Sequence, residues 1–148
     1  MASDHYVLDT EVLVVASMGD QALCLDAVAL LHAIRERHLI ALDNEGEIMR
    51  EYSRYMRPAT LVAQWWSQMV TRRKISYYSS RLTRLHAAKL RDVSFHASDC
   101  KFVGVACRTP SKLLVAEESG YWQAAVVQCL QDDIRLNVLR IKDALSRA

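Results

Sequence analysis

Glycine, proline and long apolar runs are scarce in this chain of 148 residues. It has four glycines and two prolines, and none of the glycines belongs to a loop that could cradle phosphate groups, which disfavours the dinucleotide-binding and P-loop classes. No apolar run approaches the roughly 18 residues that span a bilayer. The first residues carry acid where a signal peptide carries basic side chains. We therefore expect a soluble, cytoplasmic protein that makes no contact with a membrane.

The cysteines and histidines form no metal-binding or disulfide motif. The four cysteines lack the Cys-x-x-Cys spacing of zinc sites and show no evident disulfide framework. We interpret them as buried free thiols. The five histidines are scattered, and none has metal-ligand spacing with another. A metal site in this chain is therefore expected to use carboxylate oxygens.

Acidic residues are absent from residues 57–91, although this segment contains eight lysines and arginines. The rest of the chain has eleven basic and seventeen acidic residues, so the net charge of +2 conceals a segment of +8 beside a remainder of −6. A basic block is typical of a protein that binds a polyanion, and an acidic remainder provides places for cations. A solvated helical face explains the basic block equally well.

Short apolar runs alternate with helical patterns along the chain. The runs predict strands over residues 6–8, 38–43, 112–116 and 134–139, and either a strand or an extended linker over 75–78. Helices are predicted over residues 10–17, 20–37 (capped by Asp20), 45–56, 99–107 and 120–131, with further helices that begin at Pro58 and at Ser79 or Ser80. This order predicts an α/β protein with three α/β/α layers and a central parallel sheet of four to five strands. We expect one domain over residues 1–148, with a basic helical insertion at about 57–91.

Four acids are candidates to meet at one edge of this sheet. Asp9 ends the first strand and Glu118 follows the third, and parallel strands place both at the carboxyl-end edge. Asp99 opens a helix that can point to the same edge, and Glu51 lies in the helix after the second strand. Because carboxylates that lie close together raise each other's pKa, we expect a hard divalent cation, Mg²⁺ or Mn²⁺, between them. A capping or solvated turn role is the alternative for each acid.

A carboxylate site of this kind suits hydrolysis of phosphodiester bonds, because metal ions activate the attacking water and stabilise the leaving oxygen. The basic segment would then hold the nucleic-acid backbone. The candidate nucleic-acid contacts are Arg72, Arg73, Lys74, Arg81 and Arg84. Substitution of Arg81 or Arg84 should weaken binding to all sequences and reduce its salt dependence.

The motifs around these acids resemble those of the PIN domain family of metal-dependent nucleases, in the same order along nearly the whole chain. Val7–Leu13 (VLDTEVL) is similar to the family's opening motif, a strand that ends in Asp-Thr-Asn-Val-Leu. Ile48–Tyr52 (IMREY) resembles the helix that carries the second acid, and residues 98–106 (SDCKFVGVA) resemble Asp-x-x-Phe-x-x-x-Ala. The resemblance implies that the acids of these motifs bind the metal, namely Asp9, Glu51 and Asp99.

The fourth motif, residues 114–121 (LVAEESGY), departs from the family's Val-Thr-x-Asp-x-Asp-Phe. Ala116 stands for the usual Thr, Glu118 for the first Asp and Gly120 for the second. Glu118 is one methylene longer than Asp and can still bind or orient a metal. The missing second acid leaves open whether the site holds one metal or two. The candidate accessory residues are Thr10, Asp43 and Glu47.

The resemblance implies an endoribonuclease that uses Mg²⁺ or Mn²⁺ and leaves a 5′-phosphate. Members of this size are often toxins of toxin–antitoxin modules, so the implied partners are RNA, a protein antitoxin and a second copy of the chain. One alternative is a degenerate PIN module that binds nucleic acid or protein without cleavage. Another is a receiver-like signalling domain that binds Mg²⁺, but such a domain needs a lysine after a strand, and Lys112 begins one.

Overall fold

The computed structural model describes residues 3–18 and 21–148, and over these residues five parallel strands form one sheet in the order β3-β2-β1-β4-β5. The strands are β1 (His5–Leu8), β2 (Leu39–Asp43), β3 (Ile75–Tyr78), β4 (Leu113–Val115) and β5 (Asn137–Leu139). The α-helices are α1 (Thr10–Met18), α2 (Gln21–Arg37), α3 (Glu47–Ser53), α4 (Leu61–Thr71), α5 (Arg84–Asp92), α6 (Cys100–Arg108), α7 (Ala124–Gln128) and α8 (Ile141–Arg147). Shorter helical turns are η1 (Ala97–Asp99), η2 (Ser119–Tyr121) and the π-helical η3 (Cys129–Asp133).

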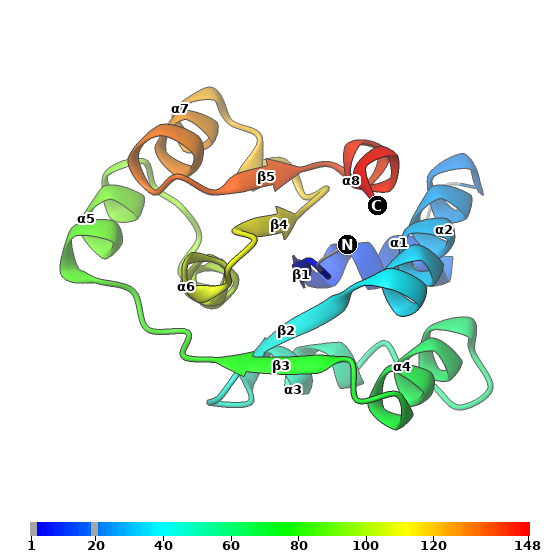
Figure 1. Ribbon diagram of the computed structural model, residues 1–148. Coiled ribbons are helices and arrows are strands. Elements are labelled where there is room, and N and C mark those ends of the chain that lie inside the picture. Colours follow the sequence, from blue (N-terminus) through cyan, green and yellow to red (C-terminus); the bar gives the residue numbers. More distant parts are fainter. Residues whose placement is uncertain (1–2, 19–20) are drawn as a thin grey trace.

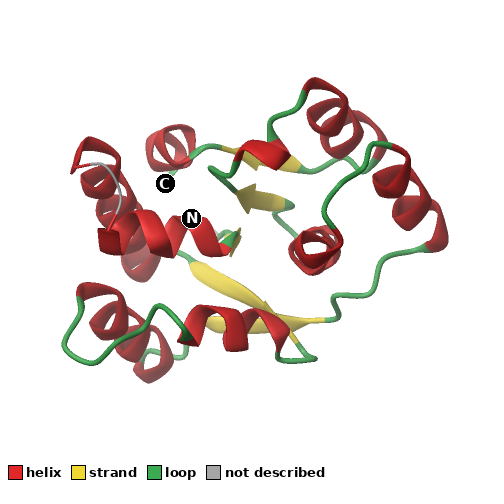
Figure 2. Cartoon of the chain, turned by 180° about the vertical axis from the view of Figure 1, so that it is seen from behind, coloured by secondary structure: helices red, strands yellow, loops and turns green. Residues whose placement is uncertain are grey.

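Helices cover both faces of the sheet (Figure 1). Helix α6 packs against β1, β2 and β4 on one face, and α5 and α7 lie on the same side. Helices α1, α2, α4 and α8 lie on the other side, where α2 contacts the other three. The view from behind shows the same two groups with the strands between them (Figure 2). The three-layer α/β/α fold predicted from the sequence is therefore confirmed.

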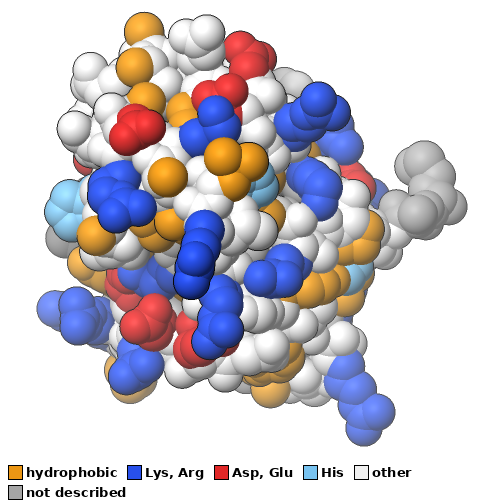
Figure 3. Space-filling view, turned by 90° about the vertical axis from the view of Figure 1, so that its left-hand side faces the viewer, with side chains coloured by type: hydrophobic (Ala, Val, Ile, Leu, Met, Phe, Trp, Pro, Cys, Tyr) orange, Lys and Arg blue, Asp and Glu red, His pale blue; other side chains and the backbone are white. Residues whose placement is uncertain are grey.

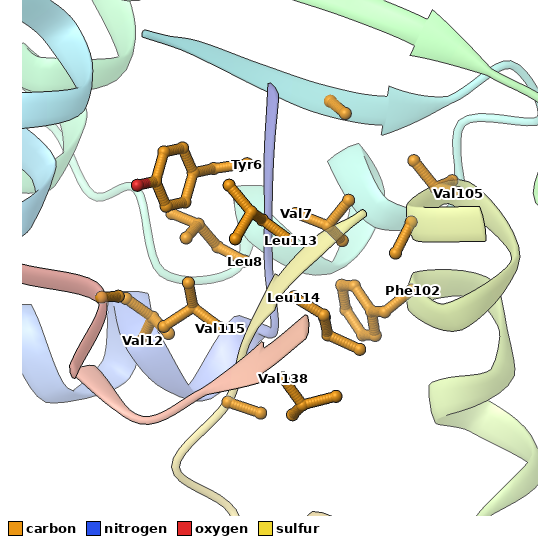
Figure 4. Packing of buried hydrophobic residues seen from close by; sticks show 14 of the residues in the cluster. Tyr6, Val7, Leu8, Val12, Phe102, Val105, Leu113, Leu114, Val115 and Val138 are labelled. Atoms are coloured by element: carbon orange, nitrogen blue, oxygen red, sulfur yellow. The ribbon is translucent and has the colours of Figure 1, made fainter. Parts of the chain in front are cut away.

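The core surrounds the central strand β1. Figure 4 shows Tyr6 and Leu8 on one side of this strand and Val7 on the other, as the alternation of side chains along a strand requires. Leu114 of β4 lies beside Phe102 of α6 in the same view, and all five side chains are fully buried. A strand buried on both faces has no polar side, which explains why β1 is a continuous apolar run in the sequence. The first polar side chain after it is Asp9.

Two helix starts predicted from the sequence are wrong, and in both cases a threonine determines the start. Thr60 caps α4, because its hydroxyl oxygen accepts the N–H three residues on at 3.2 Å, so Pro58 lies in the preceding turn. Thr83 caps α5 in the same way at 3.1 Å, so this helix begins several residues after Ser79 and Ser80. The predicted cap of α2 at Asp20 lies outside the described residues.

The C-terminal third also differs from the prediction. The helix predicted over 120–131 is divided into η2, α7 and η3. The N–H of Ile134 bonds to the carbonyl of Cys129 at 3.0 Å, and that of Leu136 bonds to the carbonyl of Leu130 at 2.8 Å. These bonds keep residues 134–136 against the end of η3, so these residues do not join the sheet. The strand predicted over 134–139 is therefore the shorter β5.

The basic segment 57–91 contains a strand as well as helices α4 and α5. This strand is β3, which pairs with β2 from Ile40 to Asp43 and forms one border of the sheet. The helix predicted over 45–56 is the shorter α3. In the ranges 3–18 and 21–148, no single helix is long and apolar enough to cross a membrane.

Candidate acidic site at the carboxyl ends of the strands

Asp9 lies at the carboxyl end of the central strand, where it is 4% exposed. Its backbone N–H bonds to the carbonyl of Val115 at 2.9 Å, which ties the end of β1 to β4. Its Oδ2 accepts the backbone N–H of Glu11 at 3.3 Å, and its Oδ1 accepts the hydroxyl of Tyr121 at 3.2 Å. Two long hydrogen bonds are weak compensation for a carboxylate removed from water.

The electrostatics of the site follow from this burial. The pKa of Asp9 is raised from its ordinary 3.8 to about 7, first by burial and then by the negative charges of Asp99 and Glu51, while its two hydrogen bonds oppose the rise. Burial also raises the pKa of Asp99, and the charges of Glu118 and Glu51 add to this rise. The four acids predicted from the sequence therefore act on one another electrostatically.

Glu51 differs from the other three acids because it already has a cationic partner. The Nζ of Lys101 lies 2.7 Å from Oε2 of Glu51, and the two side chains are 11% and 30% exposed. The same Nζ donates to the carbonyl oxygen of Ser98. The charge of Lys101 also lowers the pKa of Asp99, although it does not cancel the rise. Lys101 therefore supplies a positive charge inside the site.

In the part of the chain that the structure describes, no three His, Cys, Asp or Glu side chains are arranged to hold a metal ion. The chemistry of Asp9, Asp99 and Glu118 nevertheless fits a hard divalent cation, since burial and then neighbouring negative charge raise the pKa of the two aspartates. Thr10 adds an oxygen: its hydroxyl is buried and has no hydrogen-bond partner among the described residues. These residues could hold Mg²⁺ or Mn²⁺, while Glu51 is engaged by Lys101.

The two accessory acids have different surroundings. Asp43 ends β2 and is 1% exposed. Its Oδ2 accepts the N–H of Glu47 at 2.8 Å and its Oδ1 accepts the N–H of Ile48 at 2.9 Å, so it caps the first turn of α3. Glu47 is exposed on that turn and lines a cleft with Lys101. Asp43 therefore has a structural role, and Glu47 faces the neighbourhood of the site.

Two clefts border the acids. The first has a volume of about 460 Å³ and is lined by Asp99 and Glu118 together with Phe95, His96, Ser98 and Gln123. The second has a volume of about 440 Å³ and is lined by Lys101 and Glu47 together with Ser80, Leu82 and Ser98. A Cβ added at Gly120, which lines the first cleft, would lie 2.8 Å from Oε2 of Glu118. The position where the PIN motif has its second acid thus adjoins the Glu118 carboxylate.

The five predicted nucleic-acid contacts lie apart from these acids. Residues 72–74 precede β3 at the amino-end edge of the sheet, where Arg72 pairs with Glu36 at 3.1 Å. Arg81 lies beside the C-terminal end of α6, because Arg108 donates to its carbonyl oxygen at 2.7 Å, and Arg84 begins α5 three residues later. The acids lie at the N-terminal end of α6. Figure 3 views the side of the molecule on which α5 and α6 lie, and lysines and arginines are spread across it.

Three further residues of the site were not predicted from the sequence. Tyr121 replaces the phenylalanine of the resembled motif, and its hydroxyl bonds to Asp9. Tyr52 is fully buried and donates its hydroxyl to the carbonyl of Leu8 directly before Asp9. Burial and then the charge of Asp9 raise the pKa of both tyrosines well above 10. Lys101 is the third. The tyrosine at the phenylalanine position of the motif could have been noticed in the sequence, whereas nothing in the sequence links Lys101 to Glu51.

Comparisons of the chain with protein-family models, with curated proteins and with solved structures gave no match. The resemblance to PIN domains therefore stays a prediction from motifs. The geometry contributes the parallel sheet, the buried Asp9 at the carboxyl end of its central strand, and the electrostatic link to the other acids.

Proposed function

We propose that the protein is a divalent-metal-dependent phosphodiesterase, and specifically an endoribonuclease. The observation that carries this proposal is Asp9, a buried carboxylate whose pKa is raised to about 7 by burial and by Asp99. Such a site has surplus negative charge, which a bound divalent cation neutralises. Mg²⁺ and Mn²⁺ suit it, because all the candidate ligands are oxygens.

The residues around the ion would have separate roles. Asp9 and Asp99 would bind it, and Glu118 would bind or orient it from the rim of the larger cleft. When bound there, a divalent ion would supply activation of the attacking water and neutralisation of charge on the phosphate. Tyr121 fixes the orientation of Asp9 by its hydrogen bond, and the ammonium of Lys101 offers a second positive charge toward the phosphate.

RNA is the favoured substrate because the motifs resemble those of ribonucleases. The same resemblance supports a protein antitoxin and a second copy of the chain as partners, in the cytoplasm. The clefts beside Asp99 offer room for a polynucleotide strand, and the arginines near α5 offer contacts for its backbone.

The test is a cleavage assay with labelled single-stranded RNA and DNA, in Mn²⁺, in Mg²⁺ and in EDTA. We expect cutting only with metal, with RNA preferred, and a loss of at least about a hundredfold in the Asp9→Asn and Asp99→Asn variants. Asp132→Asn, at an exposed position on η3, is the control and should cut like the wild type. Equal cutting by the wild type and the Asp9→Asn variant would contradict the proposal.

A second candidate function is a module that binds nucleic acid without cutting it. The pairing of Glu51 with Lys101 favours this candidate, because it removes one acid from the set available to a metal. Binding of RNA in the same assay, without cleavage in any metal, would support it over the nuclease.

A further inference from the structure

Three clefts on the α6 side of the molecule lie next to one another. The cleft that contains Asp99 shares Ser98 with the cleft that Lys101 lines. That second cleft shares Leu82 with a third, which has a volume of about 180 Å³. The other residues that line the third cleft are Arg81, Thr83, His86, Cys107 and Arg108. The three clefts therefore lie in a row along α6, from its N-terminal end to its C-terminal end, and we call this row the α6 groove.

The charge of this groove changes sign along its length. Asp99 and Glu118 line its first part, whereas the third cleft is lined by two arginines and a histidine, with no carboxylate among the residues of the described ranges. Neither Arg81 nor Arg108 forms an ion pair with any residue that the structure describes. The nearest acid is Glu45, whose pKa is lowered by hydrogen bonds from Ser80 and also by the charge of Arg81, but Glu45 does not line the cleft. A cleft lined by basic side chains alone attracts anions.

The local structure holds the guanidinium of Arg108 and the backbone before Arg81 in place at the third cleft. The Nη2 of Arg108 donates to the carbonyl oxygen of Arg81 at 2.7 Å, which fixes its guanidinium at the cleft. The segment before Arg81 packs closely on α6: a Cβ on Gly104 would lie 1.8 Å from the carbonyl oxygen of Ser80, so only glycine fits there. Glu45 also anchors this segment by accepting the N–H and hydroxyl of Ser80 at 2.9 and 2.7 Å. The basic end of the groove is thus a built part of the fold.

The distance between the two ends suits a short stretch of polynucleotide. Helix α6 has nine residues, which corresponds to a length of about 13 Å, and a few nucleotides span it.

We propose that the third cleft is a phosphate-binding subsite for a single-stranded nucleic acid whose reacting phosphate lies beside Asp99. The nature of this ligand rests on the proposed function. Arg81 and Arg108 bind a backbone phosphate a few nucleotides away from the reacting one, and the clefts between them hold the intervening nucleotides. The subsite sets a minimum substrate length and contributes to binding without taking part in the chemistry.

The test measures binding in EDTA, so that cutting does not interfere. Fluorescence anisotropy of labelled single-stranded RNA, from the dinucleotide to the octanucleotide, gives the affinity as a function of length and salt. We expect a rise in affinity once the strand is long enough to reach Arg81. For the octanucleotide, Arg81→Ala should weaken binding about fivefold and lower the salt slope by about one, while dinucleotide binding stays unchanged. Arg37→Ala is the matched control, an exposed arginine at the C-terminal end of α2 on the other side of the sheet, and should bind like the wild type.

Two results would overturn the subsite. Octanucleotide binding by Arg81→Ala that equals the wild type would mean that Arg108 only stabilises the C-terminal end of α6. An equal loss in Arg37→Ala would mean that the effect is one of net charge. If the wild type cut no RNA while Arg81→Ala still weakened octanucleotide binding, the nuclease would be refuted and the subsite kept. The two proposals therefore fail separately.

Discussion

Asp9 and Asp43 end neighbouring strands at the same edge of the sheet, and both are almost fully buried, at 4% and 1% exposure. Their surroundings nevertheless differ. Asp43 accepts two short backbone N–H bonds from the first turn of α3, at 2.8 and 2.9 Å. Asp9 accepts one long backbone bond and one tyrosine hydroxyl, and burial and then nearby carboxylates raise its pKa.

The comparison shows that an acid at the end of a buried strand has one of two roles. Its hydrogen-bond donors and the charges around it determine which role it has. Asp43 uses its charge to satisfy backbone donors at a helix N-terminus, so it stabilises the fold. Asp9 retains surplus charge, so it costs stability in the absence of a cation. An acid that costs stability is the better candidate for function.

The largest expected effect is on the structural member of the pair. Asp43→Ala should lower the free energy of unfolding by about 4 kcal/mol, because two N–H groups of α3, one of them buried, lose a charged acceptor. Urea denaturation followed by circular dichroism measures this loss. Asp43→Asn keeps one acceptor oxygen and should lose about half as much. A loss below about 1 kcal/mol for Asp43→Ala would contradict the structural role of Asp43.

Asp9→Asn should have the opposite effect and raise the free energy of unfolding. The pKa of Asp9 is about 7 in the folded state against 3.8 ordinarily, so between these values the folded state keeps a proton that the unfolded state has lost. The stability of the wild type therefore falls as pH rises from about 4 to 7 and is constant above. The neutral Asn avoids this loss and should be more stable by about 3 kcal/mol above pH 7, in EDTA, with no gain near pH 4. A gain in stability that does not change with pH would show that it does not come from the ionisation of Asp9.

A smaller effect is expected at Lys101. Lys101→Met leaves Glu51 without its partner and should lower the free energy of unfolding by about 1–2 kcal/mol in EDTA, since the pair is partly buried. Glu51 then joins the uncompensated acids, so Mn²⁺ should bind more tightly than to the wild type, as isothermal titration calorimetry measures. Lys142→Met, at an exposed position on α8, is the control and should change neither quantity. Weaker Mn²⁺ binding in Lys101→Met would show that the lysine supports the ion.

The sequence predicted the parts of the molecule that depend on local pattern. Alternating apolar and helical runs predicted the parallel three-layer fold, and the ends of the strands identified Asp9 as an acid at the carboxyl edge. Contacts between distant segments were not predictable in this way. The pairing of Lys101 with Glu51 joins two helices fifty residues apart, and the different roles of Asp9 and Asp43 depend on which N–H groups each carboxylate meets. The hydrogen bond from Arg108, at the end of α6, to the carbonyl oxygen of Arg81 also depends on the path of the chain after β3.

The most direct measurement is the thermal unfolding of three proteins with and without Mn²⁺: the wild type, Asp9→Asn and Asp43→Asn. A ligand that binds only the folded state stabilises it by about 2.7 kcal/mol at a hundred times its Kd, which raises the Tm of a chain of this size by several degrees. We expect this rise in the wild type and in Asp43→Asn, which keeps the site, and none in Asp9→Asn. The same rise in all three proteins, or no rise in the wild type, would contradict a metal site at Asp9.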